Sequence, residues 1–391
     1  MNVDLPAPLG PVKPYLRPDK KAVDTSSNKI LAPKRMETLL TVITGEYYFT
    51  LKSNYNGIQL KLHLALVLST ALAATAGHTL LKPISFTAGG DFDYLTVDSV
   101  NRRLYVSHGT QVEVIDIDTG KTVGKVEKTE GVRGIAVVPN LNRGFTSNGA
   151  VDTVTIFDLK TLATLGTVNV GQNPGAILYE AYSKRVFTFN SGTINTTAID
   201  AATGKVLGSM MLGGKPEGAA ADGKGTIFVN IVDTNEVVAF DSKRLEILNR
   251  WPITGCVNAV SMTLDEKNHR LFVGCHSRAL IVVDSKNGHK LTTLPIGEQV
   301  GASAYDPATK LLYASNGDGT VTVIQQESSN KYSVVETVKT QWGAKMMAYD
   351  PKQRRLYLSS AEYDAAEPGK KAERGAVRPG TFKVLVVQQA P

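Results

Sequence analysis

An aromatic residue recurs along this chain at an almost constant interval. It closes a short strand-forming run every 40 to 44 residues, at Tyr105, Phe145, Phe187, Phe228, Phe272, Tyr313 and Tyr357. Aspartates that follow apolar runs keep nearly the same interval, at Asp116, Asp158, Asp200, Asp241 and Asp284. A repeat of this length with several short strands is typical of one blade of a β-propeller, because a lone four-stranded sheet leaves both of its faces uncovered. Seven aromatics therefore predict seven blades.

The two ends of the repeat region predict how the ring closes. The last repeat lacks a fourth strand, because the chain ends soon after the apolar run at 383–387. Residues 80–86, ahead of the first blade, have the character of an outer strand without a blade of its own. Pairing them would remove an open sheet edge. The predicted fold is all-β: a seven-bladed β-propeller over residues 78–391, with four-stranded antiparallel blades and the last blade closed by an N-terminal strand.

Composition and charge agree with this fold and disfavour one class of partner. Glycine accounts for 35 of 391 residues, as expected for many short strands joined by turns. The formal net charge is +7, but 9 of the 43 basic and 5 of the 36 acidic side chains precede residue 78, which leaves +3 on the propeller. A nucleic-acid-binding domain usually carries a strongly basic surface. DNA binding is therefore possible but disfavoured.

Residues 60–76 have the three parts of a signal peptide. Lys61 supplies the positive charge, Leu62–Leu68 the short apolar segment, and an Ala-Thr-Ala sequence ending at Ala76 the cleavage site. The apolar segment is short for a bilayer-spanning helix, which needs ~20 residues. We predict cleavage after Ala76, a periplasmic or secreted protein, and no stable membrane span after processing. An uncleaved membrane anchor is the alternative.

Residues 1–59 show none of the repeat. They are rich in proline and lysine at first, and they have no sustained helical or strand period. We interpret them as a disordered segment or as the product of a misassigned translation start. In the second case, translation would begin at Leu60.

Three repeat segments carry a family resemblance. Leu104–His108, Leu312–Asn316 and Leu356–Ser360, each leading toward a Val-x-Val-Ile-Asp type of strand, resemble the repeats of the YVTN-repeat, YncE-like β-propellers. The resemblance covers residues 78–391 and departs from the family pattern where Gln325 and Gln388 replace aspartate. It implies an exported seven-bladed protein that binds something. Members of this group include DNA binders, haem-associated propellers, surface proteins and, more distantly, lactonases.

Two loops of each blade are expected to open on the same face, around the central channel. Aligned starts of the inner strands are Asp93, Arg133, Gly175, Glu217, Asn258, Gly301 and Lys345, and the ends of the second strands are His108, Asn148, Asn190, Asn230, His276 and Asn316. Convergent polar groups at a channel mouth are the default binding-site hypothesis. The predicted binding residues are Asp93, Arg133, Glu217, Asn258, Lys345, His108 and His276.

Each of these residues also has a structural interpretation. Asparagine side chains at strand ends often cap turns, because the amide mimics a backbone group. The charged residues can pair with one another across a narrow channel. An insertion of about twenty residues between Leu358 and Lys383 is either a lid or partner-binding arm over this face, or plain surface variation.

No motif in the sequence identifies a catalytic or cofactor site. Walker, H-E-x-x-H and G-x-S-x-G motifs are absent, and so is the C-x-x-C-H motif of covalent haem. His108 and His276 belong to blades one and five, too far apart to share a metal ion. The sequence favours a monomeric binding or scaffold module for an unknown small molecule or protein partner. A lactonase-like enzyme that uses Glu217, Arg133 or His108 is the alternative.

The two cysteines of the chain both lie in blade five. Cys256 precedes an inner strand, and Cys275 ends the strand paired antiparallel to it, so the hairpin returns one residue toward the other. We therefore predict a disulfide, which an oxidising compartment would favour. Two free buried thiols or a redox-active pair beside His276 remain alternatives.

Overall fold

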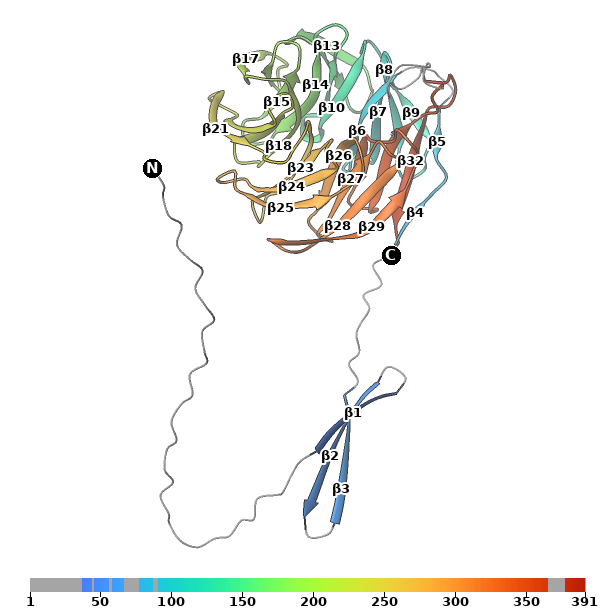
Figure 1. Cartoon of the computed structure of the whole chain (residues 1–391). Coiled ribbons are helices and arrows are strands. Elements are labelled where there is room, and N and C mark those ends of the chain that lie inside the picture. Colours follow the sequence, from blue (N-terminus) through green and yellow to red (C-terminus); the bar gives the residue numbers. More distant parts are fainter. Residues whose placement is uncertain are drawn as a thin grey trace, which may run out of the picture. The chain divides into compact units, whose positions relative to one another are not determined.

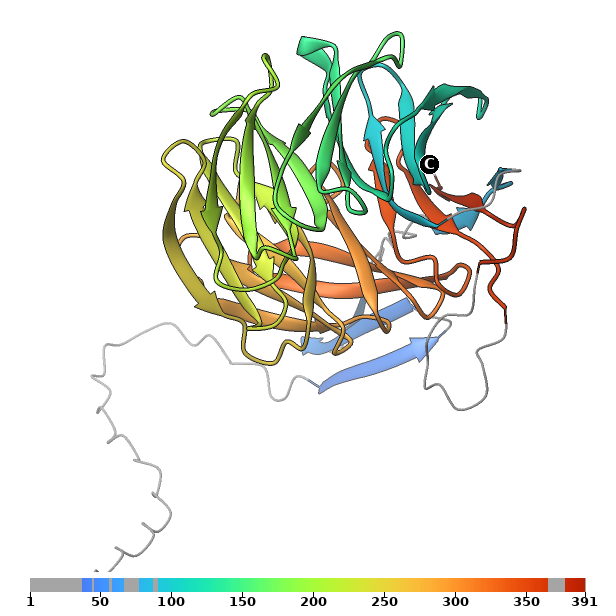
Figure 2. The ribbon, with the colours of Figure 1, turned by 90° about the horizontal axis from the view of Figure 1, so that it is seen from above.

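The computed structural model describes residues 37–43, 46–55, 58–66, 77–86, 91–364 and 377–390. They belong to two compact units, divided between Ala73 and Ala74. The second unit is a ring of seven antiparallel sheets, seen in two orientations in Figures 1 and 2. The predicted all-β, seven-bladed propeller is therefore confirmed.

Each blade contains four strands in order from the channel outward. Blade one has β6 (Phe92–Asp98), β7 (Arg103–His108), β8 (Gln111–Asp116) and β9 (Thr122–Val126). Blade two has β10 (Val132–Val138), β11 (Arg143–Asn148), β12 (Thr153–Asp158) and β13 (Thr164–Asn169), with a 3₁₀ turn at Pro139–Leu141. Blade three has β14 (Pro174–Glu180), β15 (Arg185–Asn190), β16 (Asn195–Asp200) and β17 (Val206–Met211).

The next three blades repeat the same order. Blade four has β18 (Pro216–Ala221), β19 (Thr226–Ile231), β20 (Glu236–Asp241) and β21 (Glu246–Pro252). Blade five has β22 (Ala259–Asp265), β23 (Arg270–Cys275), β24 (Ala279–Asp284) and β25 (Lys290–Pro295). Blade six has β26 (Val300–Asp306), β27 (Leu311–Asn316), β28 (Thr320–Ser328) and β29 (Lys331–Lys339).

Blade seven joins the two ends of the propeller. Its strands are β30 (Met347–Asp350), β31 (Arg355–Ser360), β32 (Lys383–Gln389) and the N-terminal β4 (His78–Leu80), with β5 (Ile84–Ser85) also paired to β32. Leu80 lies opposite Val387 in this antiparallel register. Figure 1 shows the blue β4 and β5 beside the red-orange β32. The predicted closure by an N-terminal strand is confirmed, because β4 and β5 cover an edge of β32 that would otherwise be open.

The repeated aromatic holds neighbouring blades together. All seven aromatics lie in the second strand of their blade, and none is more than 3% exposed. Their rings pack on the next blade: Tyr105 lies 5.7 Å from Phe157, and Phe187 lies 5.8 Å from Phe240, between ring centroids. An aromatic side chain buries a large apolar area with few rotatable bonds. The periodic residue is therefore the inter-blade core.

On one face of the ring, buried carboxylates also link the blades. They end four inner strands, they are at most 2% exposed, and we call them the belt carboxylates: Glu180, Asp265, Asp306 and Asp350. Each accepts a hydrogen bond from a neighbouring blade, at 2.8 to 2.9 Å from Ser242, Gln326, Tyr349 and Arg102 respectively. Each also accepts backbone N–H groups of its own turn. Buried polar groups contribute to stability only when they are paired in this way.

A disulfide joins Cys256 to Cys275, with 5.4 Å between the Cα atoms. Cys275 pairs with Ala259 in the β22–β23 ladder, which returns it toward Cys256 as the sequence predicted. Both side chains are buried.

The first unit contains a three-stranded antiparallel sheet: β1 (Glu37–Ile43), β2 (Glu46–Tyr55) and β3 (Ile58–Leu66). The sequence had suggested no regular structure before residue 60. Strand β3 overlaps the start of the expected signal peptide, whose remaining residues 67–76 lie outside the described residues; the signal peptide stays a prediction. The central part of the 361–380 insertion also lies outside them, and a bridge between Tyr363 and Val377 joins its two ends. Within the described ranges, no helix has the length and apolar character needed to cross a bilayer.

Candidate binding site at the mouth of the channel

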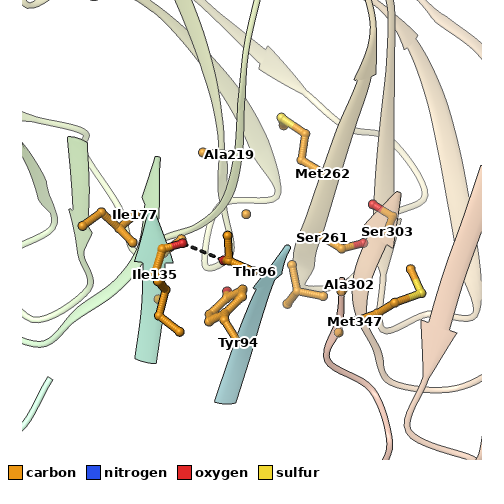
Figure 3. A pocket seen from close by; sticks show the side chains of 15 residues that line it. Tyr94, Thr96, Ile135, Ile177, Ala219, Ser261, Met262, Ala302, Ser303 and Met347 are labelled. Carbon is orange, nitrogen blue, oxygen red and sulfur yellow. Dashed lines mark hydrogen bonds between the residues drawn. The ribbon is translucent and has the colours of Figure 1, made fainter. Parts of the chain in front are cut away.

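The seven inner strands surround a small central cavity. It has a volume of about 200 Å³ and takes lining residues from every blade. Figure 3 shows Tyr94, Ile135, Met262 and Met347 around it, and a hydrogen bond of 2.7 Å from the Thr96 hydroxyl to the Ile135 carbonyl. This section of the channel is a narrow chamber of mostly uncharged side chains.

Glycines let the inner strands approach closely at the channel wall. A Cβ atom on Gly134 would lie 2.8 Å from the carbonyl oxygen of Gly175, and one on Gly301 would lie 2.6 Å from that of Lys345. Any larger residue at these positions would push adjacent blades apart. The glycines therefore set the width of the channel where it opens.

Charged side chains converge at that opening. A second cavity of about 150 Å³ shares Tyr94, Val260 and Gly301 with the chamber, and it lies at the starts of the inner strands. Five residues with acidic, basic or imidazole side chains line it, and we call them the mouth: Asp93, Arg133, Glu217, His276 and Lys345. They come from blades one, two, four, five and seven. Five of the seven binding residues predicted from the sequence thus lie around one cavity.

The mouth changes the proton affinity of its members. Burial, and then the negative charge of Asp93, raise the pKa of Glu217 above its usual value; Arg133, Lys345 and a hydrogen bond from Tyr94 act in the opposite direction. Burial is also the main cause of the raised pKa of Tyr94. A carboxylic acid with a raised pKa in a cavity can exchange a proton closer to neutral pH than an exposed one.

His276 is uncharged near neutral pH. Burial, followed by the positive charge of Lys345, lowers the pKa of its imidazole below 6.5. A neutral imidazole can both donate and accept a hydrogen bond. At neutral pH the mouth therefore combines cationic, anionic and neutral polar groups.

Asn258 does not belong to the mouth, and the alignment that placed it there is wrong. The β22–β23 register pairs Ala259 with Cys275, just as the β10–β11 register pairs Val132 with Asn148. The blade-five residue equivalent to Arg133 is therefore Val260, which lines the mouth cavity. Asn258 is exposed, with a left-handed φ of 53°, and its carbonyl accepts the His276 N–H. Its observed role is to shape the loop.

His108 is also misplaced by the sequence prediction. Its side chain is 2% exposed as a residue and lies inside the ring closure, 4.4 Å from the Phe382 ring. Its Nδ1 lies 3.6 Å from a carboxylate oxygen of Glu113. His108 occupies the slot that holds asparagine in other blades, so it faces the inside of its own blade and not the channel.

The asparagines at the ends of the second strands are structural. The amides of Asn148, Asn190 and Asn316 are buried and donate to threonine hydroxyls of the third strand, for example Asn148 to Thr155 at 2.9 Å. In blade four this slot holds Ile231, and Asn230 donates instead to the Ser261 carbonyl. The hydrogen bonds of these side-chain amides therefore stay within the propeller.

A wider groove adjoins the mouth over blades one and two. Its volume is about 570 Å³, and Asp93 and Arg133 line both the groove and the mouth cavity. Phe92, Val132 and Ala150 supply apolar lining. No sequence pattern indicates this groove, because its shape depends on the loops of two adjacent blades.

The described part of the chain holds no cluster of three or more His, Cys, Asp or Glu side chains suited to a metal ion. The chemistry of the mouth is that of hydrogen bonding, ion pairing and proton exchange.

Comparison with known families relates the chain to an established family. Residues 109–367, well over half of the chain, match the family described as outer membrane protein assembly factor BamB. No curated protein matches the sequence. A seven-bladed propeller of this kind fits a binding or scaffold module, and the family match together with the disulfide is compatible with an extracellular or periplasmic location.

Solved structures share the fold at low sequence identity. The RRP9 WD40 repeats align with a TM-score of 0.67 and 9% identity, over 81% of this chain and 98% of theirs. A chain of the mitotic checkpoint complex gives 0.64 and 15%, over 80% and 91%. A chain of Kuenenia stuttgartiensis hydrazine synthase gives 0.62 and 18%, over 70% and 94%. These similarities support the propeller fold alone.

Proposed function

The chain belongs to the family of the outer membrane protein assembly factor BamB, and from this premise we propose that it is an exported, monomeric binding module whose ligand or partner docks at the mouth of the channel. One observation carries the proposal: five acidic, basic or imidazole side chains from five blades line a single cavity. Sites of this kind combine a concave surface with a few convergent polar groups. The narrower kinship with YVTN-repeat, YncE-like propellers is part of the same proposal.

The contrast with the rest of the ring supports a binding role. Glu180, Asp265, Asp306 and Asp350 are fully engaged in hydrogen bonds within the propeller. The mouth instead gathers cations and anions around a cavity that continues into an open groove. Charged groups gathered in this way cost stability when the chain folds, and interactions with a ligand offset that cost.

A ligand screen with matched variants tests the proposal. Thermal shift and native mass spectrometry would be run with short peptides, lactones, haem, divalent cations and DNA. A ligand should bind the wild type and Lys160→Gln equally, because Lys160 is exposed on a turn at the other end of blade two. It should bind the Glu217→Gln/Lys345→Gln variant at least tenfold more weakly. A ligand that binds this double variant as well as the wild type would contradict a mouth site. For DNA, affinity insensitive to salt would exclude phosphate contacts.

Export has its own test. The protein would be recovered from its native host, and its N-terminus sequenced. A mature terminus at Gly77 in the periplasmic or secreted fraction is the expected result. Recovery of Met1 in the cytoplasmic fraction would contradict export.

One observation favours a second function, hydrolysis of a lactone. Glu217 has a raised pKa in a cavity that also holds the cationic Arg133, and an acid with a pKa nearer neutrality is better suited to proton transfer. Turnover of lactones by the wild type and at least a hundredfold loss in Glu217→Gln would support an enzyme. Binding without turnover would leave the binding module as the function.

A further inference from the structure

We propose that Arg133 binds the carboxylate of an extended peptide, and that the remainder of this peptide lies in the groove over blades one and two. The inference rests on the proposed function, since it names the class of ligand that the mouth accepts. It adds a residue, a chemical group and a direction for the bound chain.

The contacts of the Arg133 side chain support the inference. Among the described residues its guanidinium has neither a hydrogen-bond partner nor an ion pair, although the residue is only partly exposed. The comparable Arg102, at the opposite end of blade one, donates to both Asp350 and Asp118. A guanidinium presents five donors in a planar fork that matches a carboxylate in a bidentate pair. Glu217 acts on Arg133 only through its charge, so the donors of the guanidinium fork are left for an anion that can pair with them directly.

Gly149 leaves room for the Arg133 side chain. A Cβ atom on Gly149 would lie 2.8 Å from the Arg133 Nε and 3.3 Å from its Cδ. The absence of a side chain at residue 149 thus creates the space in which the arginine stem lies. This support fixes the guanidinium between the mouth cavity and the groove, and both have Arg133 in their lining.

The volumes of the mouth cavity and the groove indicate where a ligand fits. The mouth cavity of about 150 Å³ is too small for a whole ligand, whereas the groove of about 570 Å³ falls within the range of about 300 to 1,000 Å³ that is usual for ligand sites. A ligand anchored on Arg133 at their junction must therefore extend along the groove. Phe92, Val132 and Ala150 offer apolar contacts there, and Thr110 and Asp91 offer polar ones. A mixture of apolar and polar contacts suits a peptide better than a uniformly charged chain.

The charges around Arg133 favour a single carboxylate over a highly charged anion. Lys345 adds a second cation to the mouth, but Asp93 and Glu217 line the same cavity. A phosphate with nearly two negative charges would be repelled by these carboxylates more strongly than a carboxylate would. Asp93 and Glu217 also provide acceptors for N–H groups of a peptide.

The experiment measures the affinity of three peptides by isothermal titration calorimetry with the full chain. The probes are acetyl-Ala-Leu-Phe with a free carboxylate, the same peptide as its amide, and acetyl-Ala-Leu-Glu amide, which moves the carboxylate to a side chain. We expect the amide of the first peptide to bind at least tenfold more weakly than the free acid. The third peptide tells whether the C-terminal or a side-chain carboxylate is preferred.

Three variants separate the role of Arg133 from general effects. Arg133→Gln should weaken the acid at least tenfold and leave the amide unchanged, while Lys160→Gln, which removes one exposed positive charge from the same blade, should leave both unchanged. Gly149→Ala should weaken the acid by displacing the arginine without changing any charge. Unfolding midpoints of the variants confirm that each is folded.

Two results would overturn the inference. One is equal affinity of the wild type for acid and amide; the other is no binding of any acid peptide at millimolar concentration. If acid and amide bind equally and Glu217→Gln/Lys345→Gln weakens both, the mouth remains the binding site and only the carboxylate assignment falls. If a different ligand class binds in the screen above and no peptide does, the peptide inference falls while the proposed function stands.

Discussion

The two ends of the propeller use charged residues in opposite ways. At one end the belt carboxylates Glu180, Asp265, Asp306 and Asp350 are almost fully buried, and each is hydrogen-bonded to the next blade. At the other end the mouth residues line an open cavity, and the Arg133 guanidinium has no partner within the described residues. The belt carboxylates end four inner strands, whereas Asp93, Arg133 and Glu217 lie near the starts of three others. Charge at the belt end therefore stabilises the ring, whereas the Arg133 charge at the mouth end is available to a ligand.

Breaking the belt should have the largest effect on stability. Arg102→Gln would leave Asp350, which is fully buried, without its cationic partner. Removing one partner of a buried ion pair costs about 3 to 5 kcal/mol. Urea unfolding monitored by circular dichroism should show this loss, and the peptide affinity of the mouth should not change.

An exposed arginine provides the control for this variant. Arg244→Gln removes a surface ion pair with Asp241 and Glu246, and the arginine side chain is 60% exposed. Such pairs are worth about 0 to 1 kcal/mol. Equal losses for Arg102→Gln and Arg244→Gln would mean that the belt does not hold blades seven and one together.

Removing the disulfide should cause the next largest loss of stability. The measurement tells how much this covalent bond stabilises the mouth end of the ring. Cys256→Ala/Cys275→Ala opens a covalent loop with a sequence separation of 19 residues, next to His276. The chain-entropy estimate for a loop of this length is about 3 kcal/mol. Thermal unfolding with and without reductant would measure it. A wild type that loses no stability on reduction would show that the bond does not stabilise this end of the ring.

Glu217→Gln should have a smaller effect on stability, and the size of this effect should depend on pH. The folded pKa of Glu217 lies above 4.5, so between the two values the folded chain binds more protons than the unfolded chain. The free energy of unfolding therefore falls as pH rises through this window. The variant lacks this term, so it should match the wild type near pH 4 and exceed it at pH 7.

The melting temperatures of both proteins at pH 4 and pH 7 test this prediction. His276 is present in both chains, so its titration cancels in the difference. Glu246→Gln, an exposed substitution, should follow the wild type at both values. A Glu217→Gln variant that is less stable than the wild type at pH 7 would assign Glu217 a structural role like that of the belt.

The sequence predicted the ring because its periodic signal is the core itself. Tyr105 and its six equivalents are the residues that pack between blades, so their spacing counts the blades directly. The closing strand could be predicted because the last repeat lacks a strand and residues 80–86 have the character of a strand without a blade of its own. The belt was not visible, because the partner of Asp350 is Arg102, 248 residues away, and no local pattern indicates such a pair.

The mouth residues at the starts of the inner strands could be predicted because they lie at a nearly constant distance before the repeated aromatic. Arg133 lies twelve residues before Phe145, and the same count from Phe272 gives Val260, whereas the prediction used Asn258. A fixed count of twelve would have corrected this error, but it would have given Pro216 in place of Glu217, which lies eleven residues before Phe228. His108 could not be placed in this way, because histidine there replaces an asparagine whose amide faces inward in other blades.

The three-stranded sheet of the first unit has a local sequence pattern of its own, which is not part of the repeat. Residues 58–66 alternate between apolar and other side chains, and Asn56-Gly57 is the pair that two-residue hairpins favour. The same residues also satisfied the pattern of a charged and then apolar leader. The two patterns overlap in composition, so the sequence could not separate them.

The central claim is that the mouth charges serve a ligand and do not hold the blades together. The stability of a variant that loses one charge of each sign at the mouth tests this claim most directly. Arg133→Gln/Glu217→Gln removes one positive and one negative charge, and its free energy of unfolding would be measured beside that of Arg102→Gln at pH 7. We predict that the mouth variant is at least as stable as the wild type, within about 1 kcal/mol, because these charges do not hold blades together. A loss of about 3 kcal/mol or more, comparable to the loss at the belt, would show that the mouth charges are a structural ion-pair network and would contradict a binding site built from them.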